Sequence, residues 1–271
     1  MKSNNNGSIK ELATLVDSAA SQACAITQLS AQGVSLSLAQ AYQVQAASVA
    51  KRIARGEVQV GIKMGFTSRA KMLQMGVNDV IWGPLTDAML IEEGAPLDLS
   101  RFIHPRIEPE IAFLLKKPLS GKISLLEARA AVEAIAPALE IIDSRYKNFA
   151  FSLEDVVADN CSSSGVVLGQ WHSADIDIAN IGMVMECNSQ ATQIGSSAAI
   201  LGNPWRSLVA AARLAGEAGV ELAAGSIVLA GAATAAEPLR AGCHIKLLTE
   251  ALGSVSVSTL TDENGERADE K

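Results

Sequence analysis

The chain has 271 residues, of which 49% are hydrophobic, and its 22 lysines and arginines against 29 aspartates and glutamates give a formal net charge of −7. A chain of this length and hydrophobicity can bury a sizeable core without disulfides. The acidic balance, with no cluster of lysines and arginines, excludes a nucleic-acid binder, and no apolar run reaches the roughly 20 residues that span a bilayer.

The N-terminal part of the chain is predicted to be helical. It begins MKSNNNGSIKEL, which lacks the apolar stretch of a signal peptide, and the four cysteines show no CxxC spacing. We therefore expect reduced thiols in a cytoplasmic protein. Apolar residues recur at helical spacing over residues 8–57, and Ser37 followed by Gln40 indicates a capping box. We expect residues 1–56 to form a helical unit packed on the rest of the chain.

Residues 57–260 are expected to form one β-rich body. Short β-branched apolar runs, broken by glycine, proline and asparagine, are typical of strands. They are QVGIKMGF, DVIWGPL, IEPEIAFLL, PALEIID, VVADN, GVVLG, NIGMVMEC, SIVLAGA, HIKLLTE and LGSVSVSTL. Helices are expected over 125–136 and over 204–218, the second with Asn203 as N-cap and Gly219 as its stop. The charged residues 261–271 are expected to form a disordered tail, so the fold class is α+β with a mostly β, mixed-sheet body.

Three glutamates indicate a metal site. Residues two apart on a strand point the same way, so Glu108 and Glu110 would share one face, and Pro109 between them argues against a helix. Glu140 lies among apolar residues in PALEIID, where a charge needs a partner. The chain has only 3 histidines, and a set of carboxylates suits Mg²⁺ or Mn²⁺ better than zinc.

From spacing alone, the alternatives stay open. An ExE pair on a strand is a common accident, so Glu108 and Glu110 could belong to a solvated strand face, and Glu140 to a structural ion pair.

Other polar residues in apolar settings are candidates for substrate contact. Lys63 lies between glycines in GIKMGF and would bind an anionic group or transfer a proton, unless it is an ordinary strand lysine. Arg145 could recognise a carboxylate with its planar fork, or be a rim charge. Asp159 and Ser162 lie in VVADNCSSSG, which could form a polar pocket wall or a turn.

Several segments together resemble the fumarylacetoacetate hydrolase superfamily, in its hydratase and decarboxylase branch from meta-cleavage catabolism of aromatic compounds. They are GIKMGFTS with AKMLQMGV, RIEPEIAF, PALEIIDSRYKNF, VVADNCSS, LGNPWRSLVAAARLA and LGSVSVS, and the resemblance runs from about residue 39 to 260. It implies a fumarylacetoacetase-type body, a divalent ion (Mg²⁺ or Mn²⁺) on Glu108, Glu110 and Glu140, and an active-site lysine at Lys63.

Within the branch, the chain looks more like the decarboxylases, because Ile81 stands where hydratases carry an acidic residue. An apolar side chain also suits loss of a buried carboxylate, whereas hydration needs a group that places water. The resemblance implies decarboxylation of 2-oxohex-3-enedioate, a 2-oxo dicarboxylic acid, to 2-hydroxypenta-2,4-dienoate and CO₂. The alternatives are a 2-oxopent-4-enoate hydratase and a non-catalytic partner of that hydratase. We also expect a homo-oligomer that forms a complex with the hydratase.

Overall fold

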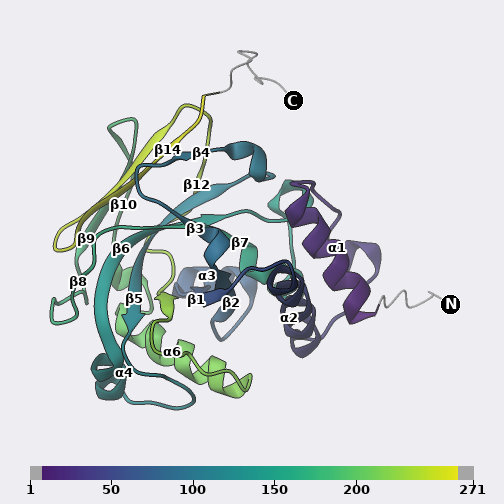
Figure 1. The fold of residues 1–271 in the computed structure, drawn as a ribbon, viewed down its shortest axis with the longest axis horizontal. Helices are drawn as coiled ribbons and strands as arrows, with labels where there is room; N and C mark the ends of the chain where they lie inside the picture. Colours follow the sequence, from purple (N-terminus) through teal and green to yellow (C-terminus); the bar gives the residue numbers. More distant parts are fainter. Residues whose placement is uncertain (1–7, 262–271) are drawn as a thin grey trace.

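The computed structural model describes residues 8–261 and shows an α+β chain with a β-rich body, as the sequence predicts. Figure 1 shows two long strands, β5 and β6, curving through the body, with two N-terminal helices, α1 and α2, side by side at one flank. The helices are α1 (Ile9–Ser21), α2 (Leu38–Ala54), α3 (Arg69–Met75), α4 (Leu125–Ala131), α5 (Leu153–Ala158) and α6 (Pro204–Glu217).

Two mixed sheets form the body. The larger runs in the order β2-β1-β11-β5-β6-β7-β3, with β12 beside β5 and β8 beside β6, and the smaller runs β10-β9-β13-β14-β4. The strands of the larger sheet are β1 (Gln59–Gly65), β2 (Ile81–Thr86), β3 (Leu90–Ile91), β5 (Arg106–Leu115), β6 (Val132–Ile142), β7 (Ser163–Leu168), β8 (His172–Ser173), β11 (Ile227–Leu229) and β12 (Glu237–Pro238). Those of the smaller sheet are β4 (Pro96–Leu97), β9 (Gly182–Cys187), β10 (Gln190–Ser196), β13 (His244–Thr249) and β14 (Gly253–Thr259).

The main core lies between these sheets and α6. Trp205 of α6 is fully buried, and its ring packs against that of Phe113 on β5 with 4.8 Å between the centroids. Burying aromatic rings of this size removes a large apolar area from water, which fixes α6 against the central strands.

Polar contacts join the N-terminal helices to each other and to the body. The Arg55 guanidinium donates two hydrogen bonds of 2.7 Å to the Asp17 carboxylate across α1 and α2. Gln45 of α2 is buried, and its Nε2 donates to the carbonyl oxygens of Trp82 (3.0 Å) and Val157 (3.1 Å). The helical unit is therefore anchored to backbone that borders the candidate site.

The local signals around the helices have mixed outcomes. The capping box of Ser37 and Gln40 and the N-cap at Asn203 are confirmed. The helix expected over 125–136 ends at Ala131, because β6 begins at Val132 and the following residues pair with β5. The strand expected in VVADN is wrong. Residues 156–158 belong to α5 and Asp159 is its C-cap; the N-cap Ser152 forms a capping box with Asp155 and overrides the β-branched pair.

The described part of the chain stops short of both ends. Residues 1–7, and all of the tail expected over 261–271 except Thr261, lie outside the described residues. Among residues 8–261, no helix combines the length and apolar composition needed to cross a bilayer.

Candidate active site

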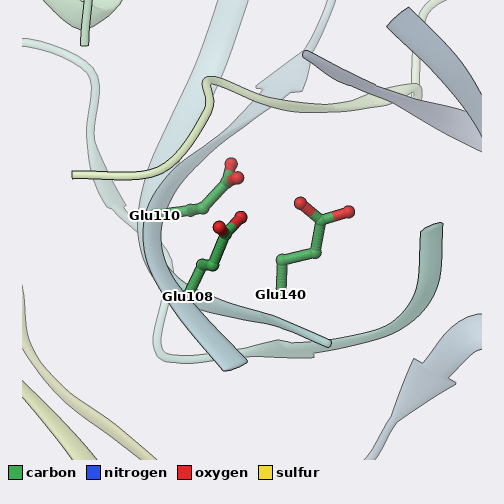
Figure 2. Close-up of side chains that lie close together, drawn as sticks. All are labelled: Glu108, Glu110 and Glu140. Atoms are coloured by element: carbon green, nitrogen blue, oxygen red, sulfur yellow. The ribbon is translucent and has the colours of Figure 1, made fainter. Parts of the chain in front are cut away.

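The register of β5 against β6 brings the three glutamates together. Glu108 pairs directly with Glu140 across the two strands, and Glu110 pairs with Ala138 one step along the same face. One carboxylate oxygen of each glutamate lies within 4.8 Å of those of the other two. Figure 2 shows the three carboxylates turned toward a common space.

On the edge of β5 that faces away from β6, the backbone between β11 and β12 reaches this cluster. Strands β12 and β11 pair with β5 only at residues 106–107 and 112–114, and the chain between them crosses the gap that these pairings leave. There the Gly231 amide donates to Glu110 Oε2 at 2.7 Å. Gly231 has a φ of +108°, and a Cβ at this position would lie 2.1 Å from Thr67 Oγ1. Only glycine fits this close approach.

Holding the three carboxylates together without a cation is energetically unfavourable. Glu110 and Glu140 are fully buried, whereas Glu108 is half-buried. Burial, and then repulsion by Glu140, raise the pKa of Glu110 well above its ordinary value; burial also raises the pKa of Glu140, although Lys63 opposes that shift. Oε1 of Glu110 and Oε1 of Glu140 accept no hydrogen bond from the described residues. Oxygen-only donors with unused lone pairs fit a hard divalent ion.

Lys63 of β1 lies beside the cluster. Its Nζ is 3.0 Å from Glu140 Oε2 and donates to the Cys161 carbonyl oxygen at 3.2 Å. Burial alone would lower the pKa of Lys63, but the negative charges of Glu140, Glu108 and Glu110 outweigh burial and raise that pKa. The ammonium therefore stays charged at neutral pH and faces the carboxylates as a hydrogen-bond donor.

A cavity of about 600 Å³ opens over the cluster. Among its lining residues are four of the predicted site residues, Lys63, Glu108, Ile81 and Ser162. Ile81 is buried and packs in an apolar cluster that includes Val156. The cavity thus has a charged floor and an apolar wall.

Arg145 and Asp159 are not brought into this cavity. Both are buried, and they form an ion pair through Arg145 Nε, supported by the Arg145 amide, which donates to Asp159 Oδ2 at 3.0 Å. The guanidinium also donates to the Asp143 carbonyl oxygen and the Ser164 hydroxyl, both at 2.7 Å. These contacts commit the guanidinium to the protein itself and hold it outside the cavity that Lys63 and Glu108 line.

Sequence reasoning missed part of the lining. Arg106 and Phe149 line the cavity, as do residues 232–236 of the chain that crosses the β5 gap. Strand alternation could have identified Arg106, because it lies two residues before Glu108. Phe149 and residues 232–236 carried no such signal, since only the tertiary fold brings them to the cavity.

Comparison with known proteins gives a consistent set of similarities. No family model matches the chain. It is 55% identical to a 4-oxalocrotonate decarboxylase from a Pseudomonas species over 251 residues, covering 93% of this chain and 98% of the relative. It is 36% identical to a 2-hydroxypent-2,4-dienoate hydratase from Pseudomonas putida, covering 72% and 90%. Among solved structures, it superimposes on the 4-oxalocrotonate decarboxylase from Pseudomonas putida G7 complexed with magnesium and adipate. That match has a TM-score of 0.91 and 37% identity, covering 94% of this chain and all of the other.

Proposed function

The chain belongs to the decarboxylase and hydratase branch of the fumarylacetoacetate hydrolase superfamily, and from this premise we propose that it decarboxylates 2-oxohex-3-enedioate (4-oxalocrotonate). The products are 2-hydroxypenta-2,4-dienoate and CO₂, in meta-cleavage catabolism of aromatic compounds. The observation that carries the proposal is a cluster of three crowded carboxylates beside a cavity that Glu108 and the apolar Ile81 both line.

The residues fit a divalent ion, and we propose Mg²⁺ or Mn²⁺. Glu108, Glu110 and Glu140 would hold it, and the support is their oxygen-only donor set and the two buried oxygens that accept no hydrogen bond from the described residues. When bound, the ion supplies a Lewis acid that attracts the 1-carboxylate and 2-oxo group of such a substrate and stabilises negative charge on the ketone oxygen.

The reaction moves charge from one end of the substrate to the other. As the bond between C5 and C6 breaks, its electrons shift through the C3–C4 double bond to the ketone oxygen, and CO₂ leaves. Lys63 keeps its ammonium beside the carboxylates, so we assign it to hold the 2-oxo acid end and to supply the proton of the product enol.

Ile81 keeps water away from the leaving carboxylate. Water solvates a carboxylate better than it solvates the more diffuse charge of the transition state, so a dry wall favours loss of CO₂. Ile81 is only 3% exposed and lies in one apolar cluster with Val156 and the half-buried Phe151. Ser162, whose buried hydroxyl oxygen has no hydrogen-bond partner among the described residues, is assigned to contact the substrate.

The assignments beyond the site follow from the chemistry. We propose a cytoplasmic homo-oligomer that associates with a 2-oxopent-4-enoate hydratase, because the product of this decarboxylation is the substrate of that hydration. We also propose that residues 1–56 and 57–260 act as a helical unit and a catalytic body, supported by the anchoring of Gln45 to Trp82.

The test is a spectrophotometric assay of the purified protein with 2-oxohex-3-enedioate and, separately, 2-hydroxypenta-2,4-dienoate. We expect loss of the first substrate, abolished by EDTA and restored by Mg²⁺ or Mn²⁺. Hydration of the second substrate with no action on the first would make the protein a hydratase. If the protein acts on neither substrate, the remaining alternative is a non-catalytic partner of the hydratase. Full activity after exhaustive chelation would contradict the role of the ion.

A further inference from the structure

Arg106 extends the row of charged side chains that begins with the glutamates. It lies two residues before Glu108 on β5 and pairs with Ile142 of β6, one step beyond the pair of Glu108 and Glu140. Two strand residues span roughly 7 Å, so Arg106 is on the same face as the cluster and next to it. Both Arg106 and Ile142 line the cavity.

The guanidinium of Arg106 has a ring contact but no carboxylate partner. Its Cζ lies 4.5 Å from the centroid of the Phe149 ring. Among the residues whose side chains the structure describes, no aspartate or glutamate forms an ion pair with it, whereas Arg52, Arg55 and Arg145 each have one. Arg106 is therefore a cation that faces the cavity. Because only the flat face of its guanidinium stacks on the ring, the N–H groups around the rim of that plane can still donate to a ligand.

The chain is strained where it supports this stack. Asn148 has a φ of 61° and Phe149 a φ of 55°, so two consecutive non-glycine residues are left-handed. This conformation is unfavourable for a residue with a Cβ. The ring is further held by contacts with His104 (5.1 Å) and Phe151 (6.0 Å) between centroids. Strain maintained by surrounding packing indicates a functional position, and here its effect is to place a ring under Arg106.

We propose that Arg106 binds the 1-carboxylate of the substrate, the carboxylate that the reaction retains; this rests on the proposed function for the identity of the substrate class, a 2-oxo acid. The planar fork of arginine matches a carboxylate edge and gives charge-assisted hydrogen bonds. Its place next to Glu108 puts it at the end of the cavity where the 2-oxo acid group is held.

The direction of charge movement selects the retained carboxylate over the leaving one. A cation at the leaving carboxylate would lose its partner as CO₂ forms, so it would stabilise the substrate more than the transition state. A cation at the retained end keeps its partner and gains attraction as negative charge arrives at the adjacent ketone oxygen. Only the second arrangement accelerates the reaction.

The test measures binding rather than turnover. Calorimetry on the Mg²⁺-loaded protein would compare 2-oxobutyrate, which has only the 1-carboxylate, with 2-oxohexanedioate, which also has a distal one and lacks the double bond needed for decarboxylation. We expect Arg106→Gln to weaken both ligands by the same factor, roughly 10- to 100-fold. The matched control is Arg101→Gln, which removes the same charge from an exposed side chain outside this cavity and should leave both affinities unchanged.

Two results would overturn the proposal. One is wild-type affinity of Arg106→Gln for 2-oxobutyrate, and the other is a loss confined to 2-oxohexanedioate, which would place Arg106 at the distal carboxylate. If Arg106→Gln does not fold, Arg106→Met keeps a long side chain on the Phe149 ring and permits the same comparison. A wild-type protein that binds 2-oxobutyrate through Arg106 but does not decarboxylate 2-oxohex-3-enedioate would refute the proposed function and support this assignment.

Discussion

Replacing Glu140 with glutamine removes one of the three carboxylates without changing the size of the side chain. It also takes away the ion-pair partner of Lys63, 3.0 Å from its Nζ. The neighbours Leu139 and Ile141 are fully buried and still pack, and the glutamine oxygen can still accept a hydrogen bond from Lys63. We therefore expect a folded protein that binds a divalent ion weakly, because in the absence of ions the lost ion pair with Lys63 is offset by relief of the repulsion between Glu140 and Glu110.

The size of the effect follows from binding linkage. An ion at 100 times its Kd stabilises the wild-type fold by about 2.7 kcal/mol, which raises Tm by roughly 5–10 °C for a chain of this size. If Glu140→Gln weakens affinity a hundredfold, the same ion concentration equals the new Kd. The stabilisation is then about 0.4 kcal/mol, or roughly 1–2 °C in Tm.

Thermal unfolding with and without Mn²⁺ or Mg²⁺, followed by calorimetric titration, measures this difference. Glu133→Gln is the matched control, because Glu133 lies on the same strand with its side chain 61% exposed and its nearest cation, Lys116, 3.7 Å away. It should keep the full wild-type shift. An unchanged ion-induced shift in Glu140→Gln would show that Glu140 is only the structural partner of Lys63.

Three further predictions concern Ile81, Cys161 and Gly231. Ile81→Asp places a charge beside the leaving carboxylate and admits water, so decarboxylation should fall roughly a hundredfold in a steady-state assay; an unchanged rate would remove Ile81 from the site. Burial raises the pKa of Cys161 to about 12, so iodoacetamide at pH 8.5 should modify exposed Cys24 but not Cys161. Peptide mass mapping decides this, and equal labelling contradicts it. Gly231→Ala forces a Cβ against Thr67 at positive φ and should destabilise the protein by about 1–3 kcal/mol in urea unfolding; the prediction fails if the midpoint does not move.

The fold class was accessible from the sequence because its signals are local. Alternating and β-branched runs indicated the long strands, and caps at Ser37 and Asn203 indicated where two helices begin. The wrong expectations lie where contacts with neighbouring segments determine the secondary structure. Val132 starts a strand because β5 pairs with it, and Val156 is helical because the Ser152 cap and its buried position outweigh β-branching.

The site was only partly predictable for the same reason. Alternation places Glu108 and Glu110 on one face, but the sequence does not contain the register that sets Glu140 opposite Glu108. The apolar neighbours of Glu140 in PALEIID made it a candidate, and the family resemblance implied that it shares an ion with the other two glutamates. Arg145 looked equally suitable for a carboxylate, and only the structure shows its guanidinium bound to Asp159, while Arg106 faces the cavity.

If the three glutamates hold the proposed ion, the pairing of Glu108 with Glu140 makes ion binding depend on the correct alignment of β5 with β6. Side chains alternate along a strand, so slipping β5 by one residue against β6 would turn Glu108 and Glu110 away from the cavity side and set Ile107 opposite Glu140. The misaligned hairpin would have no place for an ion, and an ion that binds only the aligned hairpin lowers its free energy relative to every slipped form. The three carboxylates would therefore favour the native alignment of β5 with β6 whenever an ion is bound. During refolding, dissolved divalent ions should select the native β5–β6 hairpin from its misregistered competitors.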